Sequence, residues 1–172
     1  MLPDPIEATD LNIYEPAELP WSLVRKHFEA GIGLPETPAF LGTVDPDGRP
    51  HSTGIGPVEY QGSIYFTSGP GTRKSRNLAA NPACTLSFRF PEADLIFEGD
   101  ATRILDHAEL DQVTAVFNAG GWPASRAGDA VTAPYSAQSA GPGPWYLYRF
   151  DPLTAVALGL TDPHGATRWR FR

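Results

Sequence analysis

A cluster of hydroxyls and cations surrounds a glycine-rich turn in the first half of the chain. Its members stand within eight residues of one another: Thr67, Ser68, Thr72, Arg73 and Lys74. A phosphate group accepts charge-assisted hydrogen bonds from Arg and Lys, and further bonds from hydroxyls and from free N–H groups at a helix start. The pattern therefore predicts a phosphate site. A solvated basic turn is the alternative interpretation.

The stretch that follows the turn is expected to form a short helix. Thr72 is a suitable N-cap, and Asn81-Pro82 is a stop signal, so the helix should cover about residues 73–81. Cations at its first turn oppose the helix dipole, which favours negative charge there. This mismatch indicates that an anion lies beside the helix start.

Other common sites are not found in the sequence. The glycine spacing before Lys74 does not fit a Walker motif, and neither G-x-G-x-x-G nor G-x-S-x-G occurs. The four histidines have no metal-ligand spacing, so no metal site is expected: His27, His51, His107 and His164. No residue is identified as a catalytic acid, base or nucleophile.

Composition limits the possible partners and compartment. The 172 residues carry a formal net charge of −7, which argues against a nucleic-acid binder. The single cysteine, Cys84, allows no intrachain disulfide, and its apolar surroundings predict a buried, inert thiol. No apolar run approaches the roughly 20 residues of a membrane helix, and no signal peptide is visible. We expect a cytoplasmic protein that does not bind membranes.

The arrangement of expected elements favours a mainly β fold. Residues 1–19 form an N-terminal arm, and residues 20–172 form one domain. Residues 119–143 are a long Gly/Ala/Pro/Ser-rich segment, interpreted as a lid, a dimer arm or a partly disordered loop. Strands without βαβ alternation predict an antiparallel β-barrel with peripheral helices. The expected strands are 39–44, 49–60, 63–67, 83–90, 95–105, 145–150, 154–159 and 167–171, and the other expected helices are 20–30 and 106–118.

Several motifs in order resemble a known superfamily. They are Phe40–Val44, Pro46–His51, Ile64–Ser68, Thr72–Ala79 and Glu98–Ala101. This order resembles the pyridoxamine 5′-phosphate oxidase-like superfamily, the flavin and deazaflavin oxidoreductases with a split β-barrel. The resemblance covers residues 38–106 well.

The resemblance implies a homodimer with two cofactor sites at the subunit interface. Thr67, Ser68, Arg73 and Lys74, with Thr72 at the helix start, would contact the phosphate or ribityl chain of the cofactor. The strand that carries His51, Ser52 and Thr53 would lie along the isoalloxazine ring. Trp145 or Trp169 would come from the other subunit.

The function implied by the resemblance is FMN-dependent oxidation or reduction of a small molecule. One alternative is a reductase that uses the deazaflavin coenzyme F-420, and another is a non-catalytic flavin or haem carrier. The Arg-x-His signature that true pyridoxamine phosphate oxidases carry near the C-terminus is not found there, and Arg168-Trp169-Arg170 stands in its place. Activity on pyridoxamine phosphate is therefore not expected.

Overall fold

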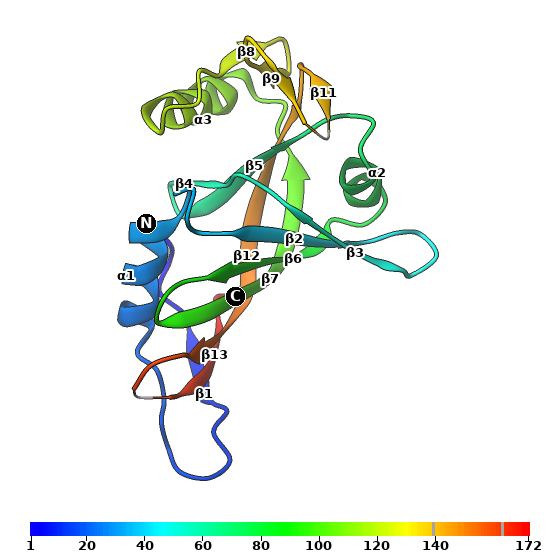
Figure 1. Ribbon diagram of the computed structural model, residues 1–172. Helices are drawn as coiled ribbons and strands as arrows, with labels where there is room; N and C mark the ends of the chain where they lie inside the picture. The colour runs from blue at the N-terminus through cyan, green and yellow to red at the C-terminus, as the bar shows by residue number, and fades with distance from the viewer. Residues whose placement is uncertain (139, 163) are drawn as a thin grey trace.

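One large antiparallel sheet curls into a barrel, and helices lie at its periphery (Figure 1). The computed structural model describes residues 1–138, 140–162 and 164–172. The helices α1 and α2 lie on opposite sides of the barrel, whereas α3 lies with β8 and β9 at one end (Figure 1). The predicted mainly β, antiparallel split barrel is confirmed.

The bounds of the elements follow the sequence patterns closely. The helices are α1 (Trp21–Gly31), α2 (Arg73–Ala80) and α3 (His107–Ala119). The strands are β1 (Glu7–Asp10), β2 (Ala39–Val44), β3 (Pro50–Gly54), β4 (Val58–Tyr60), β5 (Ser63–Ser68), β6 (Ala83–Arg89), β7 (Ala93–Arg103), β8 (Ser125–Ala127), β9 (Ala130–Thr132), β10 (Ser136–Ala137), β11 (Gly141–Pro142), β12 (Tyr146–Gly159) and β13 (Ala166–Arg170).

The long strand β12 organises the barrel. One edge of it pairs with β7 along most of its length, while the other edge pairs first with β5 and then with β13. The prediction of two strands at 145–150 and 154–159 is wrong, because the chain continues through a bulge between Pro152 and Thr154. Opposite this bulge lies Gly99, where an added Cβ would lie 2.3 Å from the carbonyl oxygen of Asp151. Only glycine permits this approach.

Two other segments differ from the sequence prediction. The expected strand 49–60 is divided into β3 and β4, which pair with different partners, β2 and β5. Segment 119–143 contains two short hairpins, β8–β9 and β10–β11, as far as its residues are described. The first hairpin packs inward through Val131, which pairs with Trp145. Part of the N-terminal arm forms β1, which extends the sheet beyond β13.

The core fills the barrel interior with alternating residues of the strands. Leu86 and Phe88 of β6 face Leu95 and Phe97 of β7, as the period-2 pattern requires. Phe28 of α1 closes this side, with ring centroids 5.3 Å from Phe88 and 5.6 Å from Phe97. None of the helices in the described residues combines the length and apolar character needed to cross a membrane.

Candidate functional site

The start of α2 gathers three hydroxyls. Strand β5 ends at Ser68, and the chain turns through Gly69 to Thr72, which caps α2 by accepting a bond from the Ser75 N–H. Ser68 Oγ lies 2.8 Å from Thr72 Oγ1 and 2.8 Å from Ser75 Oγ. The structure therefore brings the predicted residues Ser68 and Thr72 together. It adds Ser75, whose position three residues after the N-cap was a signal that the sequence reasoning missed.

Lys74 is a buried cation without an anionic partner. Only 8% of its surface is exposed, and it forms no hydrogen bond or ion pair with any residue that the structure describes. Burial lowers the pKa of its ammonium group below the ordinary value, because a charge loses solvation in the protein. A bound anion would compensate for this lost solvation, so Lys74 is suited to hold a phosphate.

Arg73 is paired with a carboxylate from another segment of the chain. Its Nη2 lies 2.9 Å from Oδ2 of Asp45, which belongs to the turn between β2 and β3. The Arg49 N–H donates to the same carboxylate, and together with Arg73 it lowers the Asp45 pKa below the ordinary value. The pair is partly exposed, so it contributes little to stability. Arg73 can offer its remaining N–H groups to an anion.

Helix α2 is tied to the strands that carry the other predicted residues. Asn77 Nδ2 donates to Thr43 Oγ1 of β2 at 2.9 Å, and both side chains are buried. Thr43 is the register partner of His51 on the neighbouring strand β3. The structure thus places β3 one strand away from the helix that carries Lys74.

His51 and Ser52 of β3 line an open groove of about 690 Å³ on the outer side of the sheet. Its polar lining includes the carboxylates of Glu98 and Asp100. The Nδ1 atom of His51 is buried and has no hydrogen-bond partner among the described residues. Thr53 does not line the groove.

The two predicted tryptophans occupy different places. Trp145 precedes β12, is 2% exposed, and packs beside Trp122 at a centroid distance of 5.7 Å. Its Nε1 has no partner among the described residues. Trp169 is 1% exposed and packs against Trp21 of α1, so it belongs to the core on the β13 side of the sheet. The structure does not bring Trp169 to the other predicted residues.

A second cavity, of about 660 Å³, adjoins the same strand end. Thr67 lines it, whereas the next residue, Ser68, belongs to the hydroxyl cluster. The remaining lining comes from the end of α1, residues 56–59, and the end of α3 with Trp122. The predicted residues Thr67 and Ser68 therefore connect the hydroxyl cluster with a cavity of ligand size.

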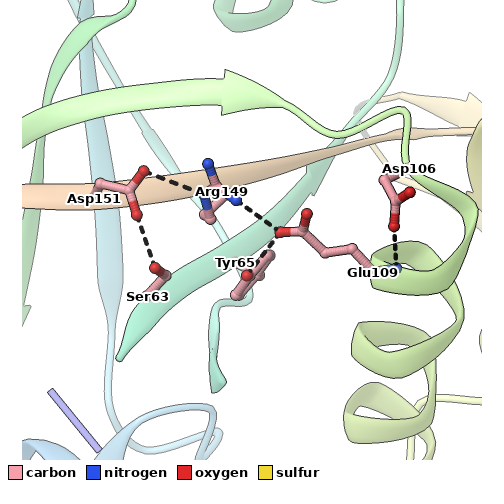
Figure 2. Close-up of polar contacts among 6 residues, drawn as sticks. All are labelled: Ser63, Tyr65, Asp106, Glu109, Arg149 and Asp151. Carbon is pink, nitrogen blue, oxygen red and sulfur yellow. Dashed lines mark hydrogen bonds and ion pairs between the residues drawn. The ribbon is translucent and has the colours of Figure 1, made fainter. Parts of the chain in front are cut away.

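A polar network attaches the first turn of α3 to β5 and β12 (Figure 2). Glu109, in the first turn of α3, accepts bonds from Tyr65 Oη at 2.9 Å and from Arg149 Nη1 at 3.1 Å. Burial and the Glu109 carboxylate raise the pKa of Tyr65 far above its ordinary value, so this phenol stays protonated and keeps donating. Arg149 is also paired with Asp151, which accepts a bond from Ser63.

Comparison with known proteins supplies the family. The sequence model of pyridoxamine 5′-phosphate oxidase matches residues 29–145, more than half of the chain. The chain belongs to the pyridoxamine 5′-phosphate oxidase family. Members of this family bind FMN or related flavins and are generally dimeric. Comparison with curated protein sequences finds no match.

Solved structures share the fold of this pyridoxamine 5′-phosphate oxidase family member. A pyridoxamine 5′-phosphate oxidase-related, FMN-binding protein from Nostoc punctiforme is 18% identical, with a TM-score of 0.56 and coverage of 90% of this chain and 97% of that chain. PhzG from Burkholderia lata is 14% identical, with a TM-score of 0.56 and coverage of 86% and 83%. An F420 reductase is 22% identical, with a TM-score of 0.52 and coverage of 74% and 94%.

Proposed function

We propose that this protein is a flavin-dependent oxidoreductase that holds FMN by its phosphate at the start of α2. The observation that carries the proposal is the Lys74 side chain, which is only 8% exposed and whose ammonium has no partner among the described residues. The residues present fit a phosphate ester, since the hydroxyls of Ser68 and Thr72 and the first N–H groups of α2 lie at the start of the helix that carries Lys74. Lys74 supplies the charge-assisted bond, and Arg73 adds N–H donors from the exposed side.

The rest of the cofactor would extend from this phosphate site toward β3. In the proposal, Thr67 contacts the ribityl chain, and His51, Ser52 and Thr53 lie along the ring. When bound, the flavin supplies the redox chemistry, while the protein binds it, orients it and excludes water. Trp145 is buried against the ring of Trp122. It is therefore proposed to support the neighbouring cavity that Trp122 lines.

We further propose that the protein functions as a homodimer through the outer face of its sheet. One cross-strand row on this face carries the apolar side chains of Phe40, Ile96 and Val156, with Ser87 between the first two, and Ile96 and Val156 are partly exposed. Phe40 is 46% exposed, although its strand neighbours Ala39 and Leu41 are buried. An exposed apolar row of this kind is typical of an interface.

Coenzyme F-420 is the second candidate for the cofactor. It is favoured by the likeness to an F420 reductase, which shares the fold at 22% identity. The absorption spectrum of the purified protein and titration with each cofactor separate the two candidates. Turnover with a panel of quinones, dyes and oxygen would distinguish an enzyme from a flavin or haem carrier.

The phosphate assignment is tested by Lys74→Ala. Removing one charged partner of a bound phosphate costs about 1.5–3 kcal/mol, so we expect FMN affinity to fall at least about tenfold in a fluorescence titration. The control is Lys26→Ala, which removes the chain's other lysine from an exposed position on α1. Unchanged affinity in a folded Lys74→Ala protein would remove the phosphate site from the proposal.

A further inference from the structure

The cavity beside Thr67 has the features of a ligand site of its own. It encloses about 660 Å³ between the end of α1, residues 56–59 and the end of α3. Small-molecule sites fall in this size range. The phosphate-binding residues proposed above do not line it, with Thr67 the point of contact.

One wall of the cavity is aromatic and firmly supported. Trp122 is partly exposed toward the cavity and packs edge-on against Phe117 of α3, with ring centroids 4.9 Å apart. Trp145 lies behind Trp122 at 5.7 Å with an interplanar angle of 35°. Such a wall offers a broad apolar surface to a planar ring.

The support of this wall extends to the barrel. Phe117 belongs to α3, whose first turn is held by the bonds that Tyr65 and Arg149 donate to Glu109 (Figure 2). Leu110 and Val113 of the same helix are fully buried in a cluster with Tyr65. Hydrogen bonds at the first turn of α3 and packing along the helix therefore position the aromatic wall.

The ionisable side chains that line the cavity are both acidic. They are Glu29 and Glu59, and among the described residues no Lys, Arg or His lines the cavity. The N-terminal ammonium of Met1 pairs with Glu59 at 2.6 Å, which leaves Glu29 as the lining carboxylate without an ion-pair partner among the described residues. Most other lining residues are apolar, among them Ile32, Leu34 and Val58. An anionic ligand would lose its hydration here without gaining a partner, which is costly.

We infer that this cavity binds planar aromatic molecules that are uncharged or cationic, and that it rejects carboxylates, sulfonates and phosphate esters. These molecules are then the substrate class of the oxidoreductase, and this substrate role rests on the proposed function. The binding selectivity itself rests on the cavity alone.

Calorimetry with a matched pair of probes tests the inference. We use 2-acetylnaphthalene and 2-naphthoate, which have nearly the same shape but differ in charge. The neutral probe is expected to bind at least about tenfold more tightly than the anion. Equal binding of the two probes, or tighter binding of the anion, would overturn the inference.

Two substitutions locate the binding. Trp122→Ala should weaken the neutral probe about tenfold or more, because it removes the stacking wall. Leu34→Arg places a cation at the rim, where Leu34 is 44% exposed, and should make naphthoate the preferred probe. Leu105→Arg, at another exposed leucine outside the cavity lining, is the control. Unaltered selectivity in Leu34→Arg would place the probe elsewhere and refute the assignment.

Addition of FMN separates this inference from the proposed function. If saturating FMN displaces the neutral probe, the cavity holds the cofactor's own ring, and the inference is overturned. If FMN and F-420 both fail to bind while the probe selectivity persists, the proposed function fails and the ligand site stands. Simultaneous binding of FMN and the neutral probe supports both.

Discussion

Lys74 and Arg73 are adjacent cations in very different surroundings. Arg73 has a carboxylate partner in Asp45, while Lys74 is buried without one among the described residues. The low pKa of Lys74, which burial causes, means that it loses its proton at a lower pH than an exposed lysine. A bound phosphate favours the protonated form, so proton loss and cofactor release are coupled.

This coupling gives a pH prediction at the residue scale. Since phosphate binds the protonated ammonium, FMN affinity should decrease as pH rises into the alkaline range, and the decrease should begin below the ordinary lysine pKa of about 10.4. The Lys74→Arg variant keeps its positive charge throughout the alkaline range, so its affinity for FMN should change less with pH. Fluorescence titrations of both proteins at several pH values measure the difference. Parallel profiles would show that another group, or the flavin itself, causes the pH dependence.

At the scale of elements, α3 depends on tertiary contacts for its placement. Asp106 caps it locally, but Glu109 attaches it to β5 and β12 through Tyr65 and Arg149. The side chain of Glu109 is 22% exposed and that of Arg149 is 37% exposed, while Tyr65 is 4% exposed. Solvent therefore screens these bonds only partly. The network therefore stabilises the wall of the cavity as well as the fold.

Glu109→Gln tests this attachment. The amide of the variant can still accept the hydrogen bond from Tyr65, but it loses the negative charge that forms the ion pair with Arg149. The free energy of unfolding should therefore fall by about 1 kcal/mol. Urea denaturation measures this change. The matched control is Asp111→Asn on the same helix, which loses a more exposed pair with Arg126 and should change stability by less than about 0.5 kcal/mol. Equal effects of the two variants would contradict a special role for the Glu109 network.

At the scale of the whole molecule, the uncovered sheet face gives the proposed dimer its interface. The inner side of the sheet is filled by the barrel core, whereas the row of Phe40, Ile96 and Val156 faces outward. In a two-fold dimer the same surface patch meets itself, so a charge added to it repels its own copy.

Ile96→Arg should therefore convert the dimer to a monomer. The expected result is a halved mass in light scattering after size exclusion, at protein concentrations where the unsubstituted chain is dimeric. Leu105→Arg makes the same chemical change at another exposed position and should leave the mass unchanged. A dimeric Ile96→Arg protein would show that the subunits associate through a different surface.

The sequence by itself determined the features that depend on neighbouring residues. The N-cap Thr72 behaves as predicted, because a capping bond is set within a few residues. The cap Asp106 and the positive φ angles of the turn residues Gly48 and Gly62 are local in the same way. The antiparallel strands follow from the period-2 alternation. The motif order also predicted the family correctly.

Only the tertiary structure decided which of these residues meet. It joined the two predicted C-terminal strands into β12, since a bulge can interrupt the pattern without ending the strand. It paired Arg73 with Asp45 across 28 positions, left Lys74 buried, and placed Trp169 in the core. Burial and charge pairing depend on segments far apart in the chain, and local patterns carry no information about which of those segments pack together.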